Sequence, residues 1–409
     1  MSLRQKIEQE IRQRGPIPFS RYMEMCLYDP ELGYYSGHAE KFGKGGDFYT
    51  SSDVHAVFGR LLTRQFDEMW RALGSPEPME VVELGPGRGL FARDVLDWSE
   101  KKFPDFFRAL EYRLVERSAS LGRRLETTLE QHVASGKARG DGQWPEGDGR
   151  DAPRSTGSGG GSGGGRARRS ASNLKEMRKG GACAGPLIVF ANEFFDALPV
   201  EVLSEEGSLR VDVRDGRFVE AWAPASVAEL EFLDRYGVRP ETGERVEAPL
   251  AALAEMKRIA NRVEHGFAVI IDYGYTRDEQ LAGRHRGTIM SYRQHQASAN
   301  PYTAPGEQDL TAHVNFTALA AAARQQGLRT QKVLTQSKFL MGIGEANQFA
   351  DAFEQCRLPQ ERAKVALQLK HLITPAGMGE TFHVLVTSKG VNQGDVRNLS
   401  GLSFGKRRA

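Results

Sequence analysis

The stretch that decides the fold is residues 81–90, which read VVELGPGRGL. An apolar run typical of a buried strand contains the acid Glu83 near its end, and a turn with Gly85, Gly87 and Gly89 follows. After the turn, apolar side chains recur three and four positions apart, as in an amphipathic helix. A strand, a glycine-rich turn and a helix in this order form the corner at which an open α/β sheet binds phosphates or nucleosides. Glycine lets the backbone turn sharply and lets a ligand lie against it.

The spacing of these glycines indicates the class of ligand. A dinucleotide-binding turn carries G-x-G-x-x-G/A, and its third small residue would fall at Leu90. The alternating glycines after Glu83 instead resemble the first motif of the class I S-adenosylmethionine methyltransferases, whose cofactor has no pyrophosphate. We therefore expect Glu83, Gly85, Gly87 and Gly89 to contact S-adenosylmethionine, and we disfavour a nicotinamide-dependent oxidoreductase. The alternative is a glycine-rich turn that binds no ligand.

Length and composition set broad limits on the class of protein. The chain has 409 residues and a formal net charge of +2, enough for one large domain with additions or for two smaller ones. No overall charge points to nucleic acid or to a membrane surface, and no apolar run is long enough for a membrane span. The three cysteines lie far apart without a C-x-x-C pair, so neither a disulfide framework nor a metal site is expected. The first residues resemble no targeting segment, which favours a cytoplasmic protein from a bacterium.

The chain divides into five consecutive regions. Residues 1–78 read as an N-terminal helical region with a polar, glycine-rich loop that would cover a cofactor, and residues 79–199 read as the first half of an α/β sheet. Residues 200–265 alternate apolar and polar around a turn and then become helical, which predicts an inserted hairpin and helices. Residues 266–390 read as the second half of the sheet with a helical insertion, and residues 391–409 as a tail.

One segment inside the first half of the sheet departs from the strand and helix pattern. Residues 136–182 consist mostly of Gly, Ser, Arg and Asp. Such a composition cannot bury enough apolar area to offset the entropy lost on ordering. We predict a flexible insertion there, which leaves the position of the third strand of the sheet uncertain.

Two acids mark the carboxyl ends of expected strands, where open α/β sheets bind their ligands. Glu116 closes the strand expected at residues 112–116, the position at which an acid accepts hydrogen bonds from ribose hydroxyls. Asp272 follows the apolar strand expected at residues 267–271. We expect Glu116 to contact the cofactor and Asp272 to lie near the reacting groups.

A third strand end carries the densest group of polar side chains. The continuous apolar run at residues 187–191 is typical of a strand buried on both faces. Asn192, Glu193 and Asp196 follow it and should face the same ligand site. Their alternative role is to stabilise the N-terminus of a following helix through its dipole.

Six stretches, in the same order along the chain, resemble the mitochondrial complex I assembly-factor methyltransferases and their bacterial relatives. They are GGDFYTS at 45–51, ELGPGRG at 83–89, NEFFDALP at 192–199, DYG at 272–274, DLT at 309–311 and MGE at 378–380. The resemblance covers nearly the whole chain and implies a class I, Rossmann-like methyltransferase sheet of seven strands with the last antiparallel. It also implies that Asp47, Thr50, Ser51 and Asn192 contact S-adenosylmethionine.

The activity that the resemblance implies is symmetric dimethylation of arginine on a protein substrate. In the mitochondrial members this substrate is a subunit of complex I. Because guanidinium has a pKa above about 12, a carboxylate must bind it and accept a proton. Glu193, Asp196 and Asp272 are the predicted catalytic acids. The alternatives are methylation of a small molecule or of another residue type, and an assembly chaperone whose cofactor pocket is structural. The sequence does not indicate an oligomeric state.

Overall fold

The computed structural model describes most of the chain, and the ranges described are 1–36, 56–142, 185–283, 286–293, 296–345 and 347–405. The predicted cofactor contacts Asp47, Thr50 and Ser51 lie outside the described residues. Residues 143–182, the larger part of the predicted flexible insertion, also lie outside the described residues. Within the described ranges, no helix is long and apolar enough to cross a membrane.

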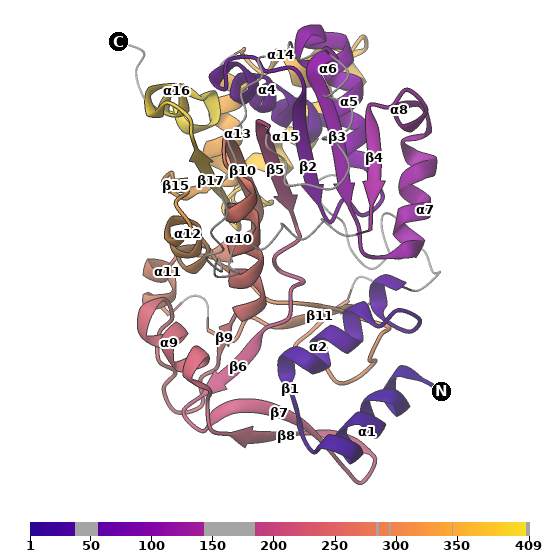
Figure 1. Ribbon diagram of the computed structural model, residues 1–409, viewed down its shortest axis with the longest axis vertical. Coiled ribbons are helices and arrows are strands. Elements are labelled where there is room, and N and C mark those ends of the chain that lie inside the picture. The colour runs from indigo at the N-terminus through magenta and orange to yellow at the C-terminus, as the bar shows by residue number, and fades with distance from the viewer. Residues whose placement is uncertain (37–55, 143–184, 284–285, 294–295, 346, 406–409) are drawn as a thin grey trace, which may run out of the picture.

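A mostly parallel sheet forms the core of the molecule (Figure 1). Its strands are β2 (Met79–Leu84), β3 (Leu110–Val115), β4 (Ala138–Asp141), β5 (Leu187–Asn192), β10 (Gly266–Tyr275), β15 (Arg329–Thr330) and β17 (Phe382–Lys389). The order is β15-β17-β10-β5-β2-β3-β4. The strands from β10 to β4 are parallel, whereas β17 runs antiparallel to β10. The predicted fold class, a class I methyltransferase sheet with a reversed strand, is confirmed.

Helices cover both faces of this sheet, which explains why its central strands are apolar almost throughout. Packed on one face are α4 (Ala56–Ala72), α5 (Leu90–Lys102), α6 (Pro104–Ala109), α13 (Gln336–Glu345), α14 (Ala350–Phe353) and α15 (Pro359–Ile373). The other face carries α10 (Leu250–Arg262) and α12 (Phe316–Gln325). Along β2, Val81 packs into the first of these cores and Val82 into the second, as the two-residue period of a strand requires.

A second, smaller unit lies beside the carboxyl ends of the central strands (Figure 1). We call it the covering lobe: residues 1–36, 200–248 and 287–312. Its elements are α1 (Leu3–Arg14), β1 (Ile17–Pro18), α2 (Phe19–Tyr28), β6 (Glu201–Ser204), β7 (Gly207–Arg214), β8 (Arg217–Ala223), α9 (Val227–Arg235), β9 (Val246–Ala248), β11 (Met290–Arg293), β12 (Gln296–Ser298) and β13 (Asp309–Thr311). The predicted hairpin is confirmed, because Asp215 and Gly216, both at positive φ, join β7 to β8.

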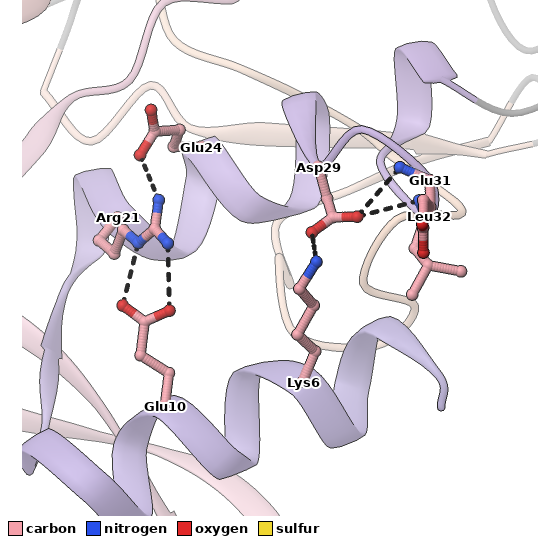
Figure 2. A network of polar contacts seen from close by, with 7 residues as sticks. All are labelled: Lys6, Glu10, Arg21, Glu24, Asp29, Glu31 and Leu32. Atoms are coloured by element: carbon pink, nitrogen blue, oxygen red, sulfur yellow. Dashed lines mark hydrogen bonds and ion pairs between the residues drawn. The ribbon is translucent and has the colours of Figure 1, made fainter.

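A network of charged side chains fastens α1 to α2 (Figure 2). Arg21 on α2 donates two hydrogen bonds to Glu10 on α1, at 3.0 and 3.1 Å, and a third to Glu24 at 2.7 Å. Lys6 on α1 pairs with Asp29, whose other oxygen accepts the backbone N–H groups of residues 31 and 32 at 3.2 and 3.1 Å. The network therefore fixes the turn after α2, which leads into the wall of the main cavity.

Two sequence predictions about this region of the sheet need correction. The flexible insertion does not begin at residue 136, because β4 lies within the predicted range and supplies the uncertain third strand. Arg113 on β3 holds this edge strand through an ion pair with Asp141 at 3.2 Å, and Ala138 is buried. No helix follows β5 directly: residues 193–199 form an irregular turn, so the acids there do not stabilise the N-terminus of a following helix.

The remaining connections complete the sheet. Short helices α7 (Ala119–Thr128) and α8 (Glu130–Ala134) precede β4, and α16 (Gln393–Asn398) follows β17. The two-residue strands β14 (Val314–Asn315) and β16 (Leu334–Thr335) pair with β10 and β17, and α11 (Arg277–Leu281) follows β10. β15 and β16 are two separate short strands, and both pair with β17.

Candidate functional site

One cavity of about 950 Å³ lies at the carboxyl ends of β2, β3 and β5. The covering lobe contributes part of its wall. The predicted site residues that line it are Glu83, Gly85, Gly87, Glu116, Asn192, Glu193 and Asp196. The structure therefore brings together seven residues that come from three separate strand ends, as expected for an open α/β sheet.

The three glycines of the turn have different surroundings, so each position requires glycine for a different reason. All have positive φ, at 64° for Gly85, 54° for Gly87 and 74° for Gly89. A Cβ at Gly85 would lie 2.8 Å from the Phe194 ring, and one at Gly89 would lie 2.7 Å from a methyl group of Leu125. A Cβ at Gly87 would meet no atom of the described residues within 4 Å, and Gly87 lines the cavity. Gly89 is not among the residues that line the cavity, and its cofactor contact stays a prediction. It is glycine because Leu125 of α7 lies close against it.

The two acids of the cofactor end lie in different surroundings. Glu83 is buried on β2, where its Oε2 accepts a hydrogen bond from the Tyr112 hydroxyl at 2.8 Å. Burial raises its pKa to about 8. Glu116, at the end of β3, is half-buried, and its Oε1 accepts the backbone N–H of Ser118 at 2.8 Å. Burial raises the pKa of Glu116 to about 7. Both residues line the cavity, and Glu116 is the more exposed of the two, so it is the better placed to accept hydrogen bonds from a ribose.

The buried Glu83 makes the stability of the ligand-free protein depend on pH. Its pKa rises from 4.5 to about 8 on folding, so the folded state holds more protons than the unfolded state between these values. Stability therefore falls as pH rises through this window. Glu83→Gln keeps an acceptor for Tyr112 and removes the ionisation. We expect its unfolding free energy, relative to wild type, to increase by up to about 1.4 kcal/mol per pH unit from pH 5 to 8. Denaturant titrations at several pH values measure this, and a constant difference would contradict it.

The backbone is strained where β5 ends. Glu193 has φ of 50°, a conformation that L-residues other than Asn and Asp rarely adopt and that costs about 1–2 kcal/mol. Its N–H donates to the carbonyl of Ile271 at 3.0 Å, and the Asn192 amide donates to Glu193 Oε1 at 3.1 Å. The surrounding structure thus holds Glu193 in a costly conformation that turns the chain along the cavity, as is common at functional sites.

Asp272 keeps this turn in place. Its Oδ2 accepts the backbone N–H groups of Phe194, Phe195 and Asp196 at 3.2, 3.0 and 3.3 Å. The carboxylate is fully buried and does not line the cavity. Burial raises its pKa well above the usual value, and the charges of Asp196 and Glu193 raise it further. The structure therefore gives no support to the predicted contact of Asp272 with the reacting groups. Asp272 is a positioning residue for the Glu193 turn.

Asp196 lines the cavity although it is only 5% exposed. The hydroxyl of Tyr273, the residue after Asp272, donates to its Oδ2. Its Oδ1 has no hydrogen-bond partner among the residues that the structure describes. Burial raises the pKa of Asp196 to about 6, so the carboxylate is mostly ionised at neutral pH and has one oxygen available to a donor in the cavity.

Several further cavity residues come from the covering lobe, and of these Tyr28 and Asp309 were not predicted as site residues. Tyr28 and Tyr35 line the wall from α2 and the turn that follows it, and Asp309 lines it from the start of β13. The Tyr35 hydroxyl donates to Asp309 Oδ1 at 3.0 Å. Asp309 opens one of the six stretches that carry the resemblance, which was the available signal for it. Tyr28 belongs to no such stretch.

The residues at the glycine turn fit S-adenosylmethionine. The open side of Gly87 leaves room against the backbone that any side chain would fill. Glu116 offers an acceptor for sugar hydroxyls at the second strand end, where α/β folds bind ribose. Among the described residues, no group of three or more His, Cys, Asp and Glu side chains is arranged to hold a metal ion.

Comparisons with known proteins agree with this assignment. The mitochondrial protein arginine methyltransferase NDUFAF7 homologue of Drosophila melanogaster is 30% identical over 95% of this chain and 85% of its own length. The human protein arginine methyltransferase NDUFAF7, mitochondrial, is 28% identical over 91% of this chain and 80% of its own. A Burkholderia thailandensis protein, solved with S-adenosyl-homocysteine bound, superposes with a TM-score of 0.76 at 28% identity. That superposition covers 95% of this chain and 92% of the other.

The family match covers the parallel strands of the sheet and the later part of the covering lobe. The family described as "Putative S-adenosyl-L-methionine-dependent methyltransferase" matches residues 61–334. This range contains the glycine turn, Glu116 and the turn after β5. S-adenosylmethionine is therefore the cofactor of the cavity, and the chain belongs to this family of S-adenosylmethionine-dependent methyltransferases.

Proposed function

We propose that the protein methylates an arginine side chain of a protein substrate and that its product is symmetric dimethylarginine. The observation that carries this proposal is the acidic wall of the cavity after β5. Glu193 and Asp196 lie there beside the cofactor turn, which is where a cationic nucleophile needs carboxylates. The names of the NDUFAF7 relatives support arginine as the substrate class. The symmetric product is proposed from the resemblance of the six sequence stretches.

The acids would act on the nucleophile in two ways. A carboxylate can accept two parallel N–H bonds from a guanidinium and so orient one nitrogen. It can also accept the proton that this nitrogen loses as the new N–C bond forms, which matters because guanidinium does not deprotonate at neutral pH. When bound, S-adenosylmethionine supplies a methyl group attached to a positively charged sulfur. Transfer of the methyl group leaves that sulfur as a neutral thioether. Glu193 is the proposed proton acceptor because its turn is held rigidly by Asp272.

The test is to identify what the enzyme labels. The purified protein is incubated with S-adenosylmethionine carrying a labelled methyl group and with extract from cells that lack its gene. Purified subunits of respiratory complexes are tested in parallel. We expect label in a protein band whose hydrolysate contains symmetric dimethylarginine, identified by mass spectrometry and chromatography. Glu193→Gln protein is the control for contaminating activity. Label on lysine or another residue, or only in the small-molecule fraction, would contradict the proposal. Cofactor binding without any transfer would favour a chaperone.

A further inference from the structure

A second acid, Asp309, lines the same cavity as Asp196 and comes from the covering lobe. Asp309 is 5% exposed, lines the cavity from β13 and accepts the Tyr35 hydroxyl at 3.0 Å. β13 is anchored near the turn after β5, because the N–H of Ala312 donates to the Asp196 carbonyl at 3.0 Å. Two buried aspartates from distant parts of the chain therefore meet at one end of the cavity.

Tyrosines line the cavity together with both acids. Tyr28 and Tyr35 contribute to its lining, and the Tyr35 hydroxyl donates to Asp309. Burial raises the pKa of both tyrosines, and the negative charges of Asp196 and Asp309 raise it further. The acidic end of the cavity is thus framed by aromatic side chains.

The tyrosines are fixed in positions that suit a flat cation. The rings of Tyr28 and Tyr35 have their centroids 5.5 Å apart, and the Tyr28 hydroxyl donates to the Ala197 carbonyl at 3.0 Å. The guanidinium of Arg117 lies 5.4 Å from the centroid of the Tyr28 ring. This ring therefore already accepts a guanidinium of the chain itself, as aromatic faces commonly do.

One buried carboxylate oxygen in this part of the cavity lacks a donor among the described residues. It is Asp196 Oδ1, and a buried carboxylate oxygen without a donor is costly. A bound cation would satisfy the open oxygen and reduce the repulsion between the acids.

We propose that Asp196 and Asp309, framed by Tyr28 and Tyr35, form a subsite that binds the guanidinium group of the incoming substrate. This assignment rests on the proposed arginine methylation. In it, Asp196 and Asp309 bind the guanidinium group, and Glu193 accepts the proton. A guanidinium fits better than an ammonium because its planar fork of five N–H donors can bridge two carboxylates and stack on a tyrosine. An ammonium is a compact point charge and gains less from this geometry.

The test uses small probes and does not require the natural substrate. Butylguanidinium, butylammonium and neutral butylurea are titrated calorimetrically into the protein saturated with S-adenosylhomocysteine. We expect butylguanidinium to bind at least about tenfold more tightly than the other two. Asp309→Asn keeps an acceptor for Tyr35 but loses the charge, and it should weaken butylguanidinium binding about tenfold or more. Asp212→Asn, on β7 outside the cavity, is the control and should bind like wild type.

The outcomes separate this subsite from the proposed function. Equal binding of butylguanidinium and butylurea, or unchanged binding by Asp309→Asn, would overturn the subsite. Butylammonium binding as tightly as butylguanidinium would overturn its guanidinium preference. If the probe binds as expected but no arginine is methylated, the subsite stands and the proposed function fails.

With an arginine peptide substrate, Asp309→Asn should raise KM about tenfold and change kcat less. Unchanged affinity for S-adenosylhomocysteine shows that the variant is folded, and Tyr35→Phe provides a second variant with a smaller expected loss.

Discussion

Gly87→Val is expected to abolish S-adenosylmethionine binding while the protein remains folded. A Cβ at this position meets no atom of the described residues within 4 Å, so we expect the valine side chain to enter the space of the cavity and not the protein core. The positive φ of 54° adds strain of about 1–2 kcal/mol, which a domain of this size should tolerate. Calorimetry with S-adenosylmethionine and with S-adenosylhomocysteine measures the loss, and thermal unfolding reports the fold.

Gly136→Val is the matched control for this variant. Gly136 also has positive φ, at 74°, and a Cβ there also meets nothing within 4 Å, but it lies in an exposed turn before β4 and outside the cavity. It should show the same strain with normal cofactor affinity. Gly85→Val, by contrast, should lose stability because its side chain would strike Phe194. Unchanged affinity in Gly87→Val, or equal loss in Gly136→Val, would reject the proposed approach of the cofactor to Gly87.

Glu193→Gln should retain cofactor affinity and lose methyl transfer by a factor of about 10² or more, the usual range for losing general acid–base assistance. Glutamine keeps the shape of the side chain and an oxygen for the Asn192 amide, whose bond to Oε1 is 3.1 Å. It cannot carry the charge that orients a guanidinium or accept its proton. Transfer rates with labelled S-adenosylmethionine, and affinity by calorimetry, measure the two effects separately.

Two further variants define the specificity of this effect. Asp196→Asn should reduce the transfer rate less, since it acts on recognition of the cation. Glu126→Gln, on the exposed face of α7, should leave both quantities unchanged. If Glu193→Gln transfers at the wild-type rate, Glu193 is not the proton acceptor. Asp196 then becomes the next candidate, because Asp272 is buried away from the cavity.

The sheet and the cofactor end of the site could be predicted because their signals are local. A strand, its glycine turn and the next helix are adjacent in sequence, and a strand buried on both faces is a continuous apolar run. The same local reasoning could not separate Gly87 from Gly89. Both are required to be glycine, but one faces the cavity and the other faces Leu125, which lies on a different helix.

The burial of Asp272 was not expected from the sequence, and it has a specific physical origin. The apolar run ends at Ile271, so the strand was expected to end there as well. In the structure β10 continues to Tyr275, because Gly274 and Tyr275 pair with β14, a strand that lies about 40 residues later in the sequence. Asp272 is therefore inside the sheet and not at its open end. Such pairing between distant residues leaves no trace in the local pattern.

The substrate end of the cavity was missed for a related reason. Tyr28 and Tyr35 come from the start of the chain and Asp309 from a late strand, yet all three line one wall. Aromatic residues in a short helix read equally well as core, and Tyr34 is indeed fully buried. Only the assembled covering lobe shows which of these side chains turn toward the cavity.

The construction of the covering lobe also determines the order in which a newly made chain can fold. The apolar faces of α1 and α2 are buried by β6, β7 and β8, and β1 pairs with β7. These partners leave the ribosome roughly 190 residues after α2, which is on the order of 10–40 s at about 5–20 residues per second. Contacts so distant in sequence form late. During synthesis, α1 and α2 therefore keep their apolar faces uncovered until these strands emerge, and we expect chaperones to bind these faces. The cavity is completed only after β13 has emerged.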